Sequence, residues 1–360
     1  MKKPTVCLVF GGKSSEYEVS LHSAFAVASH IDKEKYEVSK LGITKEGEWY
    51  LFDGDERAIF NDTWWQKSDY ITPVTLDFSI GCITVFDKIV YSVKPDIVFP
   101  VMHGAFGEDG RIQGALEMSG IKFVGCGYLS SAICMDKYLT KLVAEDIGVP
   151  CAKSVVAYKG EFASRETLRG KISKIGYPVF IKPCRSGSSV GISKVNHASE
   201  LDTALEKAFY CSDRVIAEEA VDGKEVEAAV MCDGGRIRVS TLGEIGYFGE
   251  FYDYDTKYKD KTVSYIIPAK TEKQSERAIR NYCQKLFYSL ECKGFCRMDF
   301  FVKKDGGVLF NEVNSIPGFT DISMFPKLFI NDGYSFSLLI DALITNEING
   351  GSTPHIMMTW

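Results

Sequence analysis

Acidic and amide side chains recur at strand spacing in two neighbouring segments near the C-terminal end. Arg297 and Asp299 share one face of the predicted strand FCRMDFF, because strand side chains alternate. Glu312 and Asn314 likewise share a face in LFNEVN. If the strands pair as a hairpin around KKDGG, their oxygen ligands gather beside Arg297 and suit magnesium held against substrate phosphates. The alternative is a solvated strand face of alternating charge.

A second candidate site is the Gly/Ser turn RSGSSVG at 185–191, which follows the predicted strand 177–183. Such a turn can point successive N–H groups and hydroxyls at an anion. Lys182 stands just before it, and Lys137 begins a predicted helix over 136–147. Two lysines and a Gly/Ser loop can hold a nucleotide triphosphate, although the P-loop pattern is absent. A plain surface turn is the alternative.

Two loops that follow predicted strands carry further candidates. GGKSSE offers Glu16, a carboxylate suited to an ammonium group, at the strand end where small molecules bind in open α/β sheets. Ser15 and Glu18 stand there at capping-box spacing before a helix. HGAFGEDGRIQG offers His103, Glu108 and Asp109. The alternative is a helix-capping turn, with Asp109 as the N-cap and His103 as a structural histidine.

The segment RVIAEEAVDGKEVEAAV places Glu218, Glu219 and Glu225 near the turn VDGK. A carboxylate at a strand end can take a ribose hydroxyl, and exposed backbone can pair with adenine. A charged hairpin is the competing interpretation.

The elements that position these residues alternate between strands and helices, which predicts α/β architecture. We expect an N-terminal α/β unit over 1–125, a central unit over 126–221, a C-terminal unit over 222–350 and a tail over 351–360. The aromatic, charged stretch 243–265 fits neither helix nor strand period, and loops of that length are often lids or binding loops.

Composition excludes several classes of protein. The chain has 360 residues and a net charge of −6, which disfavours sequence-independent nucleic-acid binding. No apolar run reaches the length of a membrane span, and the N-terminus resembles a first strand more than a signal peptide. Eleven scattered cysteines suggest reduced thiols in a cytoplasmic protein.

Taken together, these segments resemble the D-alanine–D-alanine ligase family of ATP-grasp enzymes. The resemblance spans about residues 4–345, with its motifs in the family's order. These motifs are GGKSSEYEVSLHSA, HGAFGEDGRIQG, MDKYLTK, IKPCRSGSSVG, EEAVDGKEVE, FYDYDTKY, GFCRMDFF and NEVNSIPGFT. It implies a three-domain ligase, with an N-terminal open parallel sheet and two ATP-grasp domains that sandwich the nucleotide.

The resemblance also implies roles for matching positions. The implied ATP-binding residues are Lys137, Lys182, Ser189, Glu218, Glu219, Val221, Glu225 and Lys257. The implied ligands of two Mg²⁺ or Mn²⁺ ions are Asp299, Glu312 and Asn314. The implied substrate-binding and catalytic residues are Glu16, His103, Ser188, Tyr252, Lys257, Tyr258, Arg297, Gly318, Ser323 and Met324.

Within that set, Glu16 would receive the ammonium of the first D-amino acid. Ser188 would link Glu16 to Tyr258 and so close a lid over 248–262. Arg297 and the Gly318 N–H would stabilise an oxyanion. Ser323 would meet the carboxylate of the second amino acid.

The implied activity is ATP-dependent joining of two D-alanines through D-alanyl phosphate, for peptidoglycan precursors, in a cytoplasmic homodimer. Tyr252 and Met324 resemble the D-alanine type, whereas GITKEGEWY and the insert around NDTWWQKSDY also resemble D-alanine–D-serine ligases of vancomycin resistance, the alternative. Three rival classes are an ATP-grasp ligase for other substrates, a nucleotide sensor and a nicotinamide dehydrogenase. The missing third glycine of the dinucleotide fingerprint counts against the last.

Overall fold

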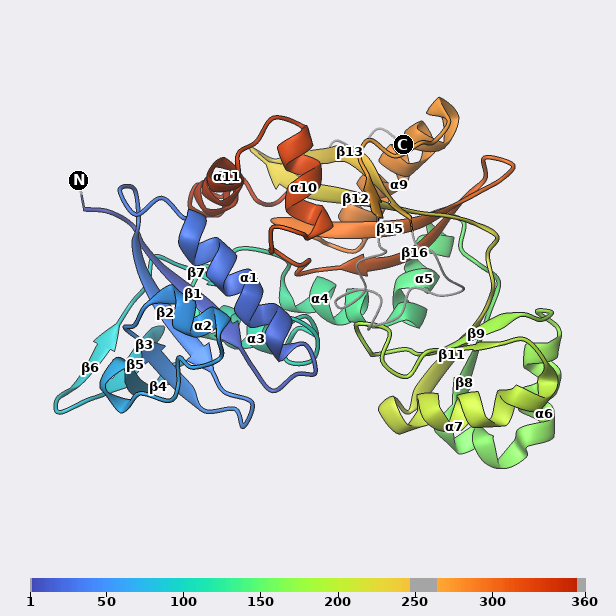
Figure 1. The fold of residues 1–360 in the computed structure, drawn as a ribbon, viewed down its shortest axis with the longest axis horizontal. Helices are drawn as coiled ribbons and strands as arrows, with labels where there is room; N and C mark the ends of the chain where they lie inside the picture. The colour runs from blue at the N-terminus through green and yellow to red at the C-terminus, as the bar shows by residue number, and fades with distance from the viewer. Residues whose placement is uncertain (1, 247–263, 355–360) are drawn as a thin grey trace.

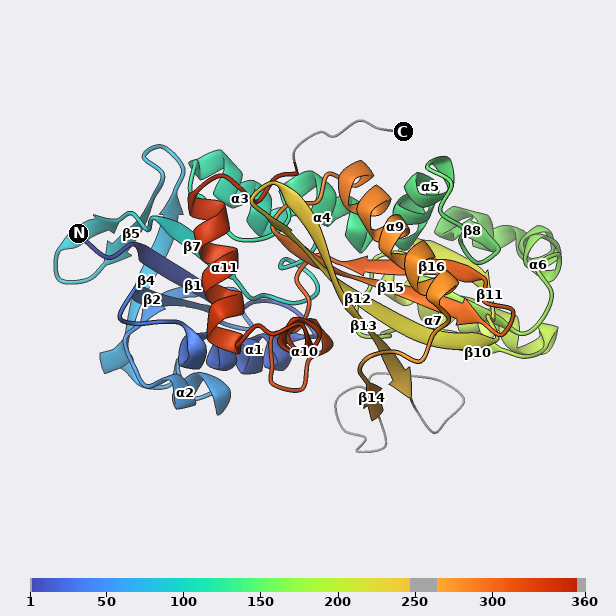
Figure 2. The same ribbon diagram turned by 90° about the horizontal axis from the view of Figure 1, so that it is seen from above.

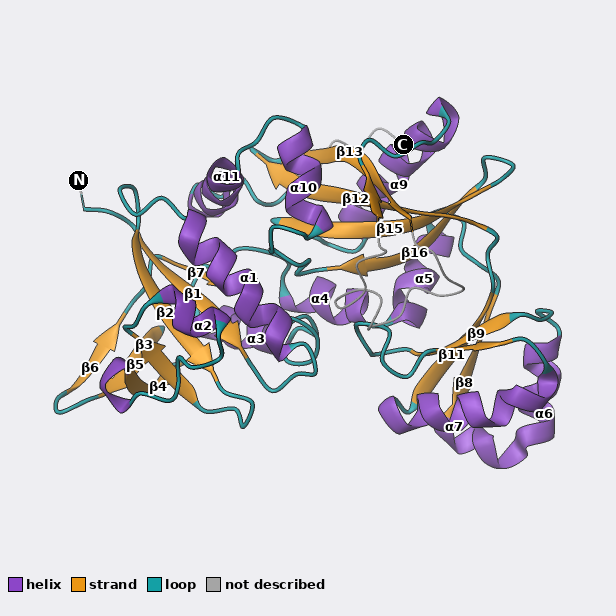
Figure 3. Ribbon diagram, viewed as in Figure 1, coloured by secondary structure: helices purple, strands orange, loops and turns teal. Residues whose placement is uncertain are grey.

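The computed structural model describes residues 2–246 and 264–354, and these residues form three β-sheets flanked by helices (Figures 1 and 3). The N-terminal sheet, the central sheet and the C-terminal sheet follow one another along the chain. The mixed α/β class expected from the sequence is therefore confirmed.

The N-terminal sheet, within the described residues, has seven strands in the order β6-β5-β4-β3-β2-β1-β7. Their bounds are β1 Thr5–Gly11, β2 Glu37–Ile43, β3 Trp49–Phe52, β4 Ile71–Asp77, β5 Cys82–Phe86, β6 Val90–Val93 and β7 Ile97–Pro100. The expected open parallel sheet is parallel only across β2, β1 and β7, and the other pairings are antiparallel. Short connections such as 44–48 can join only antiparallel neighbours, since a parallel crossover needs a dozen or more residues.

Three helices accompany this sheet: α1 Tyr17–His30, α2 Glu56–Phe60 and α3 Arg111–Ser119. The predicted capping box is wrong, because α1 begins at Tyr17 with Glu16 at the N-cap and no side-chain cap bond. The Glu16 carboxylate is thereby left for another partner. Asp109 does not cap α3 either, since Gly110 stands at that N-cap. It accepts instead from the Phe106 N–H of the preceding turn and from the N–H of Arg111, the first residue of α3.

The central sheet, among the described residues, has the order β10-β9-β11-β8 and is antiparallel throughout. Its bounds are β8 Ser154–Tyr158, β9 Val179–Pro183, β10 Ser193–Val195 and β11 Arg214–Glu219. The helices of this part are α4 Tyr128–Met135, α5 Lys137–Asp146, α6 Arg165–Ser173 and α7 Leu201–Cys211. The short 3₁₀ turns are η1 Ser68–Tyr70, in the N-terminal part, and η2 Lys159–Ser164 and η3 Ala198–Glu200 here.

The C-terminal sheet has the order β14-β13-β12-β15-β16 in the described part of the chain, again antiparallel. Its bounds are β12 Gly223–Asp233, β13 Arg236–Gly246, β14 Ser264–Ile266, β15 Phe295–Lys303 and β16 Val308–Asn314. The helices are α9 Lys273–Ser289, α10 Met324–Asn331 and α11 Phe336–Ile348. The interpretation of VDGK as a charged hairpin is wrong, because β11 and β12 belong to different sheets.

A shared apolar core joins the N-terminal and C-terminal sheets. It combines Phe10 and Phe99 of the first sheet with Phe295 of β15, Phe325 of α10 and Leu339 of α11, all fully buried. Helix α11 accordingly lies between the two sheets (Figure 2). This packing holds the loop before α10 against α1. Residues of both line the candidate site.

No single helix in the ranges 2–246 and 264–354 has the length and apolar character needed to cross a membrane. Helices α10 and α11 meet that test only as a pair, and they are bent by 100° relative to each other. All eleven cysteines are free thiols.

Candidate active site

A cavity of about 620 Å³ lies where the three sheets meet, a size typical of small-molecule sites. It is bounded by α1, the loop after β9, the β15–β16 hairpin and the loop before α10. The predicted residues that line it are Glu16, His103, Lys137, Ser188, Ser189, Arg297, Glu312, Asn314, Gly318, Ser323 and Met324. Segments far apart in sequence thus converge on one space.

One corner of the cavity is built around the Glu16 carboxylate, which is 7% exposed. Ser188 donates its hydroxyl hydrogen to Glu16 Oε1. A Cβ on Gly104 or on Gly187 would lie 2.4 Å from Glu16 Oε2, so both positions need glycine for the carboxylate to fit. Ser188 and Ser189 have φ of 46° and 59°, a left-handed conformation that is costly for serine and turns the loop toward α1.

His103 lies at the cavity wall with both ring nitrogens engaged. Its Nδ1 is 2.9 Å from the Ile316 carbonyl oxygen, and its Nε2 is 2.9 Å from Ser23 Oγ. Glu108 stands 3.6 Å from Nδ1. Burial, reinforced by the nearby Glu16 charge, raises the pKa of Glu108 despite the histidine.

The β15–β16 hairpin brings together the expected carboxylate group. Asp299 stands opposite Glu312, and Arg297 stands opposite Asn314. Arg297 donates two hydrogen bonds of 2.8 Å to the Asp299 carboxylate and lies 3.1 Å from Glu227. The Asn314 amide also donates to Asp299, at 3.0 Å.

A β-bulge between these strands decides which side chains face the cavity. Phe300 pairs with Phe310, but Asp299 pairs with Glu312, so Asn311 is the extra residue. Without it, Glu312 would share the face of Phe310, which is packed in the apolar core. The bulge therefore moves Glu312 onto the face of Asp299.

Lys137 begins α5 and reaches the same group of carboxylates. Its Nζ lies 3.2 Å from Glu312 Oε2 and donates to the Ser186 carbonyl oxygen at 2.8 Å. Asp136, which sequence reasoning missed, caps the helix by accepting from the Tyr138 and Leu139 N–H groups. An aspartate directly before a predicted helix was the available signal.

A buried charged cluster lies behind the cavity and consists of Lys141, Lys182 and Glu218. Lys141 Nζ is 2.9 Å from one Glu218 oxygen, and Lys182 Nζ is 2.6 Å from the other. Burial alone would raise the pKa of Glu218, but the two lysines lower it to about 2. Lys141 was missed, although it stands one helical turn after Lys137 in MDKYLTK.

The other predicted nucleotide residues lie away from the cavity wall. Glu219 ends β11, Val221 belongs to the crossing between sheets, and Glu225 lies on β12. Glu219 accepts a hydrogen bond from the Lys153 N–H, at 2.9 Å. Tyr252, Lys257 and Tyr258, with the proposed lid 248–262, fall outside the described residues, as does most of the tail.

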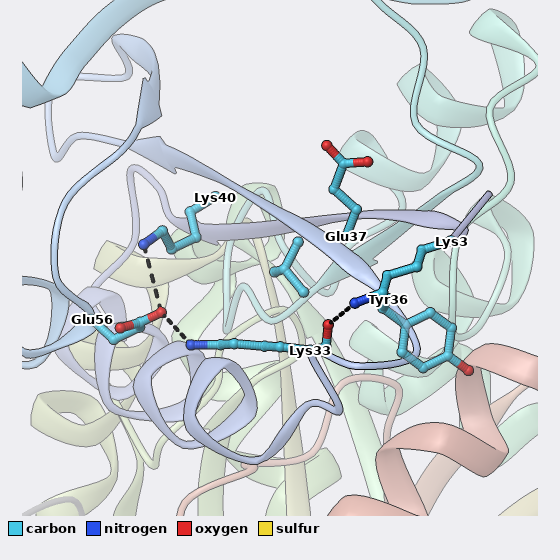
Figure 4. A pocket seen from close by; sticks show the side chains of 7 residues that line it. Lys3, Lys33, Tyr36, Glu37, Lys40 and Glu56 are labelled. Atoms are coloured by element: carbon cyan, nitrogen blue, oxygen red, sulfur yellow. Dashed lines mark hydrogen bonds and ion pairs between the residues drawn. The ribbon is translucent and has the colours of Figure 1, made fainter.

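A second, shallower pocket on the N-terminal sheet holds none of the predicted residues (Figure 4). Lys33 Nζ is 2.9 Å and Lys40 Nζ 3.7 Å from Glu56 Oε1, while Lys3 donates to the Lys33 carbonyl oxygen. Its lysines are therefore already engaged within the pocket.

Two family models of known proteins match most of this chain. A family model described as the D-ala D-ala ligase N-terminus matches residues 5–126, and the corresponding C-terminal model matches residues 143–345. This chain belongs to the D-alanine–D-alanine ligase family. A D-alanine–D-alanine ligase of Caldicellulosiruptor bescii is 43% identical, with 97% of this chain and 96% of the relative aligned.

Two solved structures of this ligase family resemble the present one. The VanG D-Ala:D-Ser ligase from Enterococcus faecalis has a TM-score of 0.88 and 39% identity, covering 96% of this chain and 100% of that one. The D-alanine–D-alanine ligase from Coxiella burnetii has a TM-score of 0.82 and 30% identity, covering 98% and 95%.

Proposed function

We propose that this family member joins two D-alanines at the expense of ATP, through D-alanyl phosphate, to supply peptidoglycan precursors. The observation that carries the proposal is the pairing of Glu16 with Ser188 in a cavity that Lys137 and Arg297 also line. An ammonium receptor that shares its cavity with Lys137, Arg297 and the carboxylates paired with them suits an amino acid whose carboxylate is to be phosphorylated.

Lys137 and the loop 186–189 supply cationic charge and N–H groups for the ATP phosphates, beside the buried charged cluster that contains Lys182. The donor set Asp299, Glu312 and Asn314 has the hard oxygens that magnesium prefers. No three His, Cys, Asp or Glu side chains in the described part of the chain form a metal site by themselves. In this proposal these residues would hold magnesium together with the substrate phosphates, whose charge the ions would neutralise when bound.

The remaining residues serve the two chemical steps. Glu16 orients the first D-alanine so that its carboxylate meets the γ-phosphate of ATP, a step that depends on positioning. In the second step the amine of the other D-alanine attacks the acyl carbon and phosphate leaves. In this proposal, Arg297 and the Gly318 N–H stabilise the oxyanion and Ser323 holds the second carboxylate; that all three line the cavity supports these roles.

Ser323 lies close to Gly318 in the loop before α10. A Cβ on Gly318 would approach Ser323 Oγ to 2.7 Å, and Thr320 donates its N–H to the same oxygen at 3.1 Å. The compact turn supports placing the oxyanion donor and the second-substrate residue side by side.

The test is phosphate release from ATP and magnesium, with mass analysis of the product. D-Alanine alone is expected to yield D-alanyl-D-alanine, and L-alanine is expected to yield nothing. Absence of D-alanine-dependent phosphate release would contradict the proposal and favour the rival ATP-grasp or sensor functions.

A D-alanine–D-serine ligase is the second candidate, favoured by the likeness to the VanG structure. The 43% identity to a D-alanine–D-alanine ligase exceeds the 39% identity to VanG, so D-alanine is the first choice. Adding equimolar D-serine to the assay separates them. A dominant D-alanyl-D-serine product would replace the first candidate with the second.

The domain boundaries at 125 and 221, the cytoplasmic location and the homodimer stay predictions. Limited proteolysis tests the boundaries, and sedimentation tests the dimer.

A further inference from the structure

A chain of buried hydrogen bonds joins α1 to the loop before α10. The Phe319 N–H donates to Ser23 Oγ at 3.2 Å, and Ser23 Oγ lies 2.9 Å from His103 Nε2. His103 Nδ1 lies 2.9 Å from the Ile316 carbonyl oxygen. Because a carbonyl oxygen only accepts, Nδ1 carries the hydrogen, and in the neutral ring Nε2 accepts the Ser23 hydroxyl hydrogen.

Both ends of this chain attach to the same short loop. Ile316 and Phe319 flank Pro317 and Gly318 in the sequence. The hydrogen bonds therefore hold the peptide groups on either side of the Pro317–Gly318 peptide, which carries the Gly318 N–H. Ser23 is fully buried and His103 is 3% exposed, so water has little access to replace either group. A lost bond there leaves a buried donor or acceptor unsatisfied.

The packing of the Phe319 side chain does not by itself fix the orientation of the Gly318 N–H. The Phe319 ring is fixed between Phe99 and Phe295, at centroid distances of 5.8 Å and 5.4 Å. Gly318 has no side chain to restrict its own rotation, and glycine has the widest backbone freedom. The direction of its N–H therefore depends on the hydrogen bonds that hold its neighbours.

We propose that Ser23 is a positioning residue which, through Phe319 and through His103, aims the Gly318 N–H at the developing oxyanion. This inference rests on the proposed function. It also gives His103 a role. Because both of its ring nitrogens form hydrogen bonds, its ring connects α1 to the loop at a fixed distance. Ser23 itself does not touch substrate.

The role predicts a selective kinetic defect in Ser23→Ala. Loss of an oxyanion donor costs about 100–1,000-fold in kcat, so a misdirected donor is expected to cost about 10–100-fold. The KM for ATP stays within about twofold. Positional isotope exchange in ATP, which reports reversible D-alanyl phosphate formation, is expected to persist because it precedes the oxyanion.

Ser20→Ala is the matched control. Ser20 is also fully buried on α1 and also bridges two segments, accepting from the Gly11 N–H and donating to the Val101 carbonyl oxygen. Its hydroxyl bonds to Gly11 and Val101 and not to the loop 316–319, so it reports the general cost of losing a buried hydroxyl. Ser23→Thr retains a hydroxyl and is expected to recover most of the lost kcat.

A double variant with His103→Gln tests whether the two residues act as one unit. If they do, the double variant is no slower than the slower single variant. A kcat for Ser23→Ala equal to that of Ser20→Ala, or an equal loss of isotope exchange and dipeptide formation, would overturn the inference. If the wild-type chain forms no dipeptide, the proposed function fails, which is a separate result.

Discussion

The buried charged cluster and the Glu16 corner of the cavity are built in different ways. In the cluster, the single Glu218 carboxylate is held by both Lys141 and Lys182, so these three side chains together carry a net positive charge. In the corner, Glu16 lacks a lysine or arginine partner among the described residues and receives a single serine hydroxyl, between two glycines. The cluster therefore has one positive charge more than Glu218 offsets, while the corner has a negative charge that no described lysine or arginine offsets.

The two arrangements suggest different contributions to the site. The cluster contributes rigidity, because removing Glu218 would leave two buried lysines without their shared partner. In the proposed function, the corner shaped by Gly104 and Gly187 receives one ammonium group. The loop that carries Ser188 connects the regions, since Lys182 precedes it on β9.

The largest effect is expected at Glu312, which lines the cavity together with Lys137 and Arg297. Glu312→Gln removes a carboxylate that faces Asp299 and pairs with Lys137, and we expect kcat to fall by about 100-fold or more. Turnover is measured across a magnesium titration. Asp305→Asn, in the exposed turn of the same hairpin, is the control. Near wild-type turnover of Glu312→Gln at limiting magnesium contradicts this role.

A second large effect is expected on stability in Glu218→Gln. The folded pKa of about 2 lies below the ordinary value of 4.5, so ionised Glu218 stabilises the fold above pH 4.5. That shift corresponds to roughly 3 kcal/mol, lost as pH falls from about 4.5 to about 2.

Urea unfolding at pH 7 and at acidic pH measures this contribution. The difference between wild type and Glu218→Gln is expected to shrink in acid, whereas Glu219→Gln, next along β11, is expected to cost little at either pH. A difference that stays constant with pH argues that the cluster is not the source of the effect.

An intermediate effect is expected at Gly187. A Cβ there would lie 2.4 Å from Glu16 Oε2, so Gly187→Ala must displace the carboxylate. We expect the KM for D-alanine to rise about tenfold, with the KM for ATP little changed. Gly170→Ala, where nothing lies within 4 Å, is the matched control. Equal changes in both KM values would show that the corner also serves the nucleotide.

The smallest effect is expected at Ser189, which has a φ of 59°. The left-handed conformation costs a non-glycine residue about 1–2 kcal/mol, so Ser189→Gly is expected to be about 1 kcal/mol more stable than Ser189→Ala. Thermal unfolding of both variants gives the comparison. The reverse order would mean that the loop relaxes when the side chain changes.

Local pattern predicted much of this site. Strand alternation placed Arg297 with Asp299, and the hairpin around 304–307 brought Glu312 opposite them as expected. The bulge was missed, although the buried apolar positions shift from Val308 and Phe310 to Val313.

Non-local pairing was the part that pattern could not supply. The local sequence around VDGK is that of a turn between two paired strands. The strands on either side of it, β11 and β12, belong to different sheets. Lys141 and Ser23 were missed for the same reason. Each is a polar residue on a helix face that becomes buried only when a distant element packs against it.

The most direct test of the contrast between the two regions is the KM for ATP and for D-alanine in Lys182→Met and in Ser188→Ala. Lys182→Met keeps the Lys141–Glu218 pair and is expected to raise the KM for ATP by about tenfold or more, with D-alanine little affected. Ser188→Ala is expected to show the opposite pattern. If each variant changes both KM values equally, the cluster and the corner do not serve separate substrates, which contradicts the proposed division of the site.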